Sequence, residues 1–150
     1  MIEDSEVAVF SCARLASQRC KNKMVRKFGD TTLLDILLSK LKSISSNTFF
    51  SGHESIFEER SKFYKVDFIP RSFESGNSEV ASEIYNFLED VDYKYLLCIN
   101  GCQPFLKRKT IEDFLSKCIK TKRPTFAVFK RNNYFMDMNN NPFNYDPQIQ

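Results

Sequence analysis

Apolar positions along the chain alternate between short continuous runs and stretches with helical spacing. The clearest run, VAVFSC at residues 7–12, is typical of a buried strand. Runs of this kind predict five strands, at residues 7–12, 48–50, 66–69, 93–99 and 125–129. Helical spacing between and after them predicts four helices, which begin near residues 33, 55, 78 and 110. Because strand and helix alternate, we expect right-handed crossovers and a three-layer α/β/α sandwich with a mostly parallel sheet.

Polar residues at the start of each helical pattern predict where the helices begin. Thr32 and Asp35 form a predicted capping box in front of the most regular pattern. Ser55 and Thr110 are expected to cap the second and fourth helices by the same logic. Ser78 is the best N-cap residue in the third segment.

The C-terminal part of the chain differs in composition. From residue 130 onward, asparagines cluster on both sides of residues 134–138. Because Asn favours turns, we expect a peripheral hairpin there. The chain has 150 residues and is long enough for one ordinary domain, which buries on the order of 70% of its unfolded surface. We therefore expect residues 1–150 to form a single domain.

The loop after the first strand gathers positive charge. Between Arg14 and Lys27 the chain has six basic residues and no Asp or Glu. The loop is also longer than the roughly 2 to 6 residues that usually connect elements of an α/β unit. Ligands of doubly wound sheets bind outside the carboxyl ends of the strands, so this loop predicts an anionic ligand.

The spacing of polar residues in this loop resembles that of a known enzyme family. The pattern is Ala13-Arg14-x-x-Ser17-x-Arg19-x-x-x-Lys23, followed by Gly29 and the apolar pair Leu33-Leu34. It is similar to the nucleotide signature of the sugar-acid cytidylyltransferases, the acylneuraminate cytidylyltransferases (CMP-sialic acid synthetases) first and the CMP-Kdo synthetases second. Relatives often have Pro-Gly in place of Lys21-Asn22, although Asn accepts a left-handed backbone well. Many also have Ser-Thr-Asp-Asp in place of Ser51-Gly52-His53-Glu54.

The resemblance implies a nucleotidyltransferase that moves CMP from CTP to a nonulosonic, sialic-type acid and releases pyrophosphate. The implied nucleotide contacts are Ala13, Arg14, Ser17, Arg19 and Lys23. Of these, Arg14 and Lys23 are the implied catalytic residues, because the reaction mainly requires positioning and cations around the phosphates. The same reaction makes CTP and a sugar acid the expected partners.

Three further positions are implied to bind the sugar acid: Arg71, Ser82 and Asn100. For Arg71 the alternative is a surface charge beside Glu74, and for Asn100 it is an ordinary Asn-Gly turn. Cys102 occupies the place of a metal-binding Asp in the CMP-Kdo synthetases, and a neutral thiol is a poor ligand for Mg²⁺. This favours the sialic-acid branch. We expect no metal-ligating residues, with Mg²⁺ arriving on the nucleotide.

Composition argues against several other classes of protein. The chain has 22 basic and 19 acidic residues, and a net charge of +3 is too small to require nucleic acid or a membrane surface. Its five cysteines include no C-x-x-C, which argues against disulfides and zinc and favours a reducing cytoplasm. No apolar stretch approaches the roughly 18 residues of a membrane helix. His53 is the single histidine, so a Ser-His-Asp triad is not expected.

Two alternatives stay open at the level of sequence. One is a CMP-Kdo synthetase-like sugar nucleotidyltransferase, and the other is a truncated or degenerate domain that binds nucleotide without catalysis. Family members continue past the region matched here, into acidic metal ligands and an arm that forms a homodimer in full-length relatives. We accordingly expect weak CTP binding, negligible turnover, and an exposed apolar patch where later strands would pack.

Overall fold

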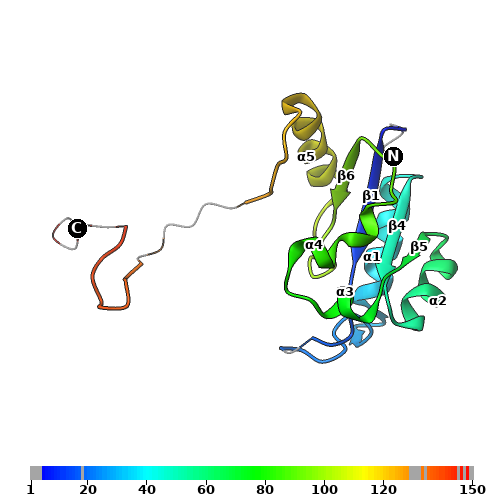
Figure 1. Ribbon diagram of the computed structural model, residues 1–150, viewed down its shortest axis with the longest axis horizontal. Coiled ribbons are helices and arrows are strands. Elements are labelled where there is room, and N and C mark those ends of the chain that lie inside the picture. Colours follow the sequence, from blue (N-terminus) through cyan, green and yellow to red (C-terminus); the bar gives the residue numbers. More distant parts are fainter. Residues whose placement is uncertain are drawn as a thin grey trace.

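The computed structural model describes residues 5–17, 19–128, 133, 135–144, 146 and 148. Its centre is a four-stranded sheet in the order β5-β4-β1-β6, in which every neighbouring pair is parallel. The strands are β1 (Val7–Cys12), β4 (Thr48–Gly52), β5 (Asp67–Pro70) and β6 (Tyr95–Cys98), as shown in Figure 1. The chain adds β4 and β5 on one side of β1 and then β6 on the other, so the topological switch point lies between β1 and β6. The predicted α/β class with a parallel sheet is confirmed.

Alternate residues of β1 face two different cores. Val7 and Val9 join the larger core, on the first face of the sheet. Three helices complete that core: α1 (Leu33–Ile44), α2 (Ser55–Tyr64) and α5 (Arg108–Thr121). Phe10 belongs to a smaller core on the second face, where it packs edge-to-face with Phe87. This period-two alternation is what a strand between two layers requires.

Short helices cover the second face. They are α3 (Phe73–Asn77), α4 (Ala81–Ile84) and the 3₁₀ turn η1 (Asn86–Leu88). The prediction of one continuous helix from Ser78 is therefore wrong. The Ser75 hydroxyl gives a physical reason, because it donates to the Glu83 carbonyl at 2.8 Å and lies 3.1 Å from Asn86 Oδ1. Such side-chain bonds tie the short segments together and compete with a regular helical ladder.

The observed helix ends test the predicted caps. The predicted N-cap at Thr32 is confirmed, since the Asp35 N–H donates to Thr32 Oγ1 at 3.1 Å, while the Asp35 carboxylate accepts the Thr32 hydroxyl at 2.8 Å in place of the backbone N–H of a full capping box. The caps predicted at Ser55 and Thr110 are wrong, because both residues already lie inside their helices. Ser78 is the C-cap of α3 rather than the N-cap of a helix.

A small hairpin, which the apolar pattern does not predict, closes the basic loop. It consists of β2 (Lys27–Phe28) and β3 (Thr31–Thr32), which pair antiparallel. Gly29 in its turn has φ +64°, a left-handed conformation that favours glycine. Strands of two residues are too short for alternating hydrophobicity to reveal them.

The fifth predicted strand is not formed in the part of it that the structure describes. Residues 125–128 belong to no strand, and residue 129 lies outside the described residues. A strand needs a neighbour for its backbone hydrogen bonds, and no described strand pairs with these residues. The predicted C-terminal hairpin is present as a short antiparallel turn with a bridge between Met136 and Pro142, although residue 134 is outside the described residues.

An exposed apolar surface lies beside the edge strand β6. A hollow of about 940 Å³ is lined there by β6, α5 and residues 122–128. Phe126 and Val128 are 84% and 88% exposed. The sequence-based expectation of an apolar patch on this protein agrees with this surface.

Candidate functional site

A cleft of about 470 Å³ opens at the carboxyl ends of β1 and β6, at the switch point of the sheet. Its first wall is formed by the end of β1 and the basic loop, from Cys12 to Met24. Its second wall comes from the α3–α4 region, including Gly76, Ser78 and Glu79. The turn that follows β6 completes the cleft.

Positive charge dominates the lining of this cleft. Its charged members are Arg14, Arg19, Lys23, Arg71 and Glu79. Four cations against one carboxylate raise the local positive potential, which attracts polyanions. Guanidinium groups suit phosphate oxygens because they donate two hydrogen bonds in a fork, and the Lys ammonium adds a compact charge. The site is therefore chemically suited to a polyphosphate.

Most of the predicted site residues meet at this cleft. Its lining includes Ala13, Arg14, Ser17, Arg19, Lys23, Arg71 and Asn100, and also Cys12 and Cys102. Ser82 does not belong to this group, because it lies exposed on α4 and does not line the cleft. Three other loop cations, Lys21, Arg26 and Lys27, also lie outside the lining. The motif spacing thus separates the loop cations that face the cleft from those that do not.

The basic loop turns through Asn22. This residue adopts φ +55°, a left-handed conformation that Asn accepts, and its N–H donates to the Leu15 carbonyl at 3.2 Å. The Leu34 N–H, at the start of α1, donates to the Met24 carbonyl at 2.9 Å and joins the loop to the larger core. Asn22 therefore makes the turn without the Pro-Gly that is common in the family sequence.

Arg71 is a buried cation, 9% exposed, that follows β5. Its Nη2 donates to the Ala13 carbonyl at 2.7 Å and its Nη1 to the Ile84 carbonyl at 3.4 Å, while the buried Nε has no hydrogen-bond partner. Arg71 is therefore not the surface charge that was the alternative interpretation. A buried positive charge without a counter-charge is destabilising, so an anion bound in the cleft beside Arg71 would stabilise this arrangement. Burial raises the pKa of the Cys12 thiol, and the Arg71 charge offsets part of that rise.

The turn after β6 is held by two side chains. Asn100 Oδ1 accepts the Cys102 N–H at 2.9 Å, so part of the Asn100 amide shapes the turn itself. Lys40 reaches across from α1 and donates to the carbonyls of Gln103 at 3.2 Å and Pro104 at 2.8 Å. Sequence analysis missed Lys40 because its partners lie 63 and 64 residues away.

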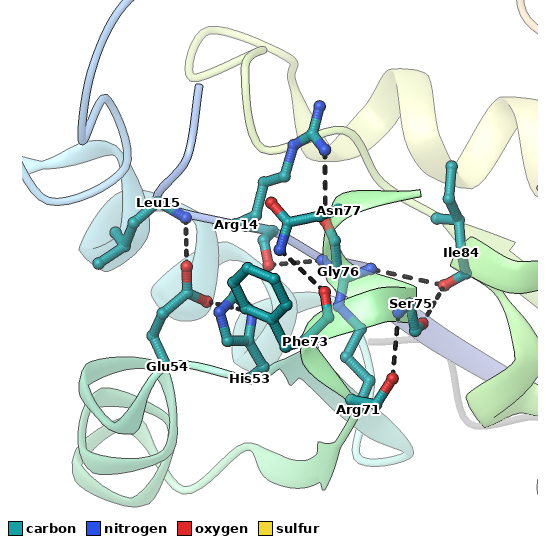
Figure 2. A network of polar contacts seen from close by, with 12 residues as sticks. Arg14, Leu15, His53, Glu54, Arg71, Phe73, Ser75, Gly76, Asn77 and Ile84 are labelled. Carbon is teal, nitrogen blue, oxygen red and sulfur yellow. Dashed lines mark hydrogen bonds and ion pairs between the residues drawn. The ribbon is translucent and has the colours of Figure 1, made fainter. Parts of the chain in front are cut away.

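Glu54 anchors the basic loop from the connection between β4 and α2. Its Oε1 accepts the Leu15 N–H at 2.6 Å, and its Oε2 lies 3.1 Å from His53 Nδ1 (Figure 2). Glu54 is the N-cap residue of α2 but makes no side-chain capping bond, because its carboxylate is turned toward the loop. Sequence analysis missed this contact. Its only signal was the departure from Ser-Thr-Asp-Asp at residues 51–54.

Neither a metal cluster nor a membrane-spanning helix is found in the part of the chain that the structure describes. There, no three His, Cys, Asp or Glu side chains lie close enough together to hold a metal ion. Magnesium prefers several hard oxygen ligands, and the cleft lining offers one carboxylate, from Glu79. The described residues therefore do not fit a dedicated Mg²⁺ site. None of the helices in these residues is both long and apolar enough to cross a bilayer.

Comparison with known proteins gives the family. The family model described as Cytidylyltransferase matches residues 9–144, which is most of the chain. The chain belongs to the cytidylyltransferase family. This is a family of nucleotidyltransferases, as the spacing of the loop residues indicated. Among curated proteins, none matches the sequence.

Two solved structures share the fold of this cytidylyltransferase family member. A CMP:2-keto-3-deoxy-manno-octonic acid synthetase complexed with CTP superposes with a TM-score of 0.63 and 13% identity, over 79% of this chain and 49% of that one. A cytidylyltransferase from Leptospira borgpetersenii serovar Hardjo-bovis (strain JB197) superposes with a TM-score of 0.62 and 21% identity, over 78% of this chain and 50% of that one. The chain spans about half the length of each structure, and at these identities the likeness shows the fold.

Proposed function

We propose that this protein binds CTP in the cleft at the switch point and transfers CMP to a nonulosonic, sialic-type acid with release of pyrophosphate. One observation carries the proposal: Arg14, Arg19, Lys23 and Arg71 line the same cleft although the sequence separates Arg71 from the other three. Membership of the cytidylyltransferase family supports CTP as the nucleotide.

The proposed reaction needs little covalent chemistry from the protein. A hydroxyl of the sugar acid attacks the α-phosphate of CTP while pyrophosphate leaves, so the side chains mainly position the reactants and stabilise negative charge. Arg14 and Lys23 are proposed to contact the reacting phosphates, with Arg19 and the Ser17 hydroxyl completing the cradle. Ala13 would contribute packing alone, because its N–H donates to the Ser51 carbonyl and its own carbonyl accepts from Arg71.

The sugar acid is proposed to bind between Arg71 and Asn100. The Arg71 guanidinium, which lines the cleft, and the amide nitrogen of Asn100 are donors suited to a carboxylate and to hydroxyls. Ser82 would reach the substrate only where the sugar extends beyond the cleft, since Ser82 does not line it. Because the described residues do not form a metal site, we propose that Mg²⁺ enters with the phosphates of the nucleotide.

Isothermal titration of the protein with CTP, UTP, ATP and GTP tests the nucleotide assignment. We expect CTP to bind most tightly. Equal affinity for all four would contradict a cytidylyltransferase site and indicate binding of polyanions in general. Pyrophosphate release is then measured with CTP, Mg²⁺ and either N-acetylneuraminate or Kdo. Release with N-acetylneuraminate alone supports the sialic-type assignment, and release with Kdo alone refutes it.

A nucleotide-binding protein without catalysis is the second candidate. It is favoured by the lack of a metal-binding cluster among the described residues, because phosphoryl transfer depends on precise placement of the α-phosphate. Selective CTP binding with no pyrophosphate release from either sugar acid supports this candidate. A CMP-Kdo synthetase-like activity is the third, and Cys102 argues against it because a thiol replaces a hard oxygen ligand.

A further inference from the structure

The residues His53 and Glu54 lie between the two walls of the cleft. On one side, Glu54 Oε1 accepts the Leu15 N–H of the basic loop at 2.6 Å. On the other side, the His53 ring packs edge-on against the Phe73 ring of α3, with 5.3 Å between the ring centres. Figure 2 shows this order of contacts from Leu15 through Glu54 and His53 to Phe73. One dipeptide thus touches both walls.

The contact inside the dipeptide joins two buried atoms, His53 Nδ1 and Glu54 Oε2. These atoms lie 3.1 Å apart, a distance that allows an ion pair, but neither makes a hydrogen bond of good geometry with the other or with any other described group. A carboxylate oxygen can only accept, so an unprotonated Nδ1 would place two lone pairs face to face. With a proton on Nδ1 the two atoms attract each other instead.

The second wall is shaped to admit the His53 ring. A Cβ on Gly76 would lie 2.8 Å from His53 Nδ1, so α3 approaches this closely only because it has glycine there. From the basic loop, Arg14 Nη1 donates to the Gly76 carbonyl at 3.4 Å. Gly76 itself lines the cleft, so the position of the His53 ring and the position of this wall depend on each other.

We propose that the His53–Glu54 pair is a brace that positions the basic loop against α3 and so sets the geometry of the cations that bind nucleotide. Glu54 is a positioning residue that acts through the Leu15 backbone, and His53 transmits the contact to α3. The expected effect of the brace on nucleotide affinity rests on the proposed function. The brace itself is a matter of structure and can be tested without nucleotide.

A brace and a purely electrostatic effect predict opposite changes in CTP affinity when the Glu54 charge is removed. Glu54 places a negative charge beside a basic cleft, so removal of that charge would strengthen binding of an anion if charge were the only effect. A brace predicts that removal weakens binding, because the loop loses its anchor. The sign of the change in affinity therefore distinguishes the two explanations.

The experiment measures the CTP dissociation constant of Glu54→Ala, Glu54→Gln and Glu58→Ala by calorimetry. Glu54→Ala is expected to weaken binding by about 10-fold, the loss that follows from a hydrogen bond to a charged group. Glu54→Gln keeps an acceptor for the Leu15 N–H and is expected to restore most of the affinity. Glu58, whose side chain on α2 is 47% exposed and paired with Lys62, gives the same change of charge as a control and should leave binding unchanged. Tighter binding by both Glu54 variants would overturn the brace.

Amide hydrogen exchange in the unmodified protein gives a second readout. It does not depend on whether any variant folds. The Leu15 N–H is expected to exchange slowly and to resonate downfield, as an amide bonded to a carboxylate does. Fast exchange at Leu15 would refute the brace whether or not CTP binds. If the protein fails to bind CTP while Leu15 is protected, the proposed function fails and the brace stands. If CTP binds and Glu54→Ala binds it as tightly, the brace fails and the proposed function stands.

Discussion

The two faces of the central sheet are covered in very different ways. On the first face, α1, α2 and α5 bury a continuous core that includes Phe50 and Phe57, both fully buried. On the second face, helices of three to five residues cover a core of four buried side chains: Ala8, Phe10, Phe49 and Phe87. The same strands therefore separate a thick layer from a thin one.

This difference indicates a division of tasks. The thick layer buries most of the apolar area and so provides most of the stability. The thin layer contributes Gly76, Ser78 and Glu79 to one wall of the cleft. Short helices with few buried contacts open more easily than a packed core, and binding sites are commonly built from such regions. Nucleotide would then order a wall that the fold itself holds weakly.

The largest effect is expected from matched truncations on the two faces. Phe50→Ala on the first face should lower the free energy of unfolding by about 3 to 5 kcal/mol, because long helices cannot collapse into the cavity. Phe87→Ala should lose about 3 kcal/mol or less, since the short η1 segment can relax. Urea unfolding of both variants measures the difference. Equal losses would show that the thin layer is as rigid as the thick one.

The next effect concerns the cleft cations. Lys23→Ala and Arg19→Ala are each expected to weaken CTP binding by about 1.5 to 3 kcal/mol, the range for hydrogen bonds to charged groups. Both side chains line the cleft, whereas Lys21 and Arg26 belong to the same loop and do not. Calorimetry on Lys21→Ala and Arg26→Ala is the matched control. Losses as large in the controls would mean that the loop acts through diffuse charge, with no special role for the cleft.

Alkylation of cysteines sharpens the comparison at the cleft. Cys102 lines the cleft and is exposed, while Cys118 lies on α5 in the thick layer. CTP is expected to slow modification of Cys102 by a neutral maleimide and to leave Cys118 unchanged. Peptide mapping after timed labelling gives both rates in one sample. No protection of Cys102 at saturating CTP would place the nucleotide away from the turn after β6.

The smallest expected effect is a pH dependence of the free energy of unfolding, caused by Cys98 on the second face of the sheet. Part of Cys98 is exposed, but its thiol is largely desolvated. Desolvation, together with the nearby Cys12 thiol, raises the pKa of Cys98 from 9.0 to about 11. The unfolded thiol loses its proton near pH 9.0 and the folded one near 11, so this contribution to stability is complete below pH 9.0 and is lost as pH rises toward 11. Urea midpoints from pH 7 to 10.5 should fall less in Cys98→Ser than in the unmodified protein. Parallel curves would show that Cys98 contributes nothing.

Much of the fold follows from patterns within a few residues of one another. The apolar run at residues 7–12 predicts β1, and the Thr32–Asp35 capping box predicts the start of α1, because both signals are local. The motif spacing likewise distinguishes Lys23, which lines the cleft, from its neighbour Lys21. Prediction failed where a segment has the local pattern of a strand but needs a pairing partner from a distant part of the chain. Residues 125–128 have the composition of a strand and no described strand beside them.

The sequence by itself determined the alternation of strand and helix, the basic loop and the family signature, since each depends on periodicity or spacing along the chain. Only the tertiary structure decided which groups hold that loop in place. Arg71 reaches the Ala13 carbonyl across 58 residues of sequence, and Glu54 reaches the Leu15 N–H across 39. Hydrogen bonds between distant segments leave no periodic trace in a single sequence, because they depend on how the strands are ordered in the sheet.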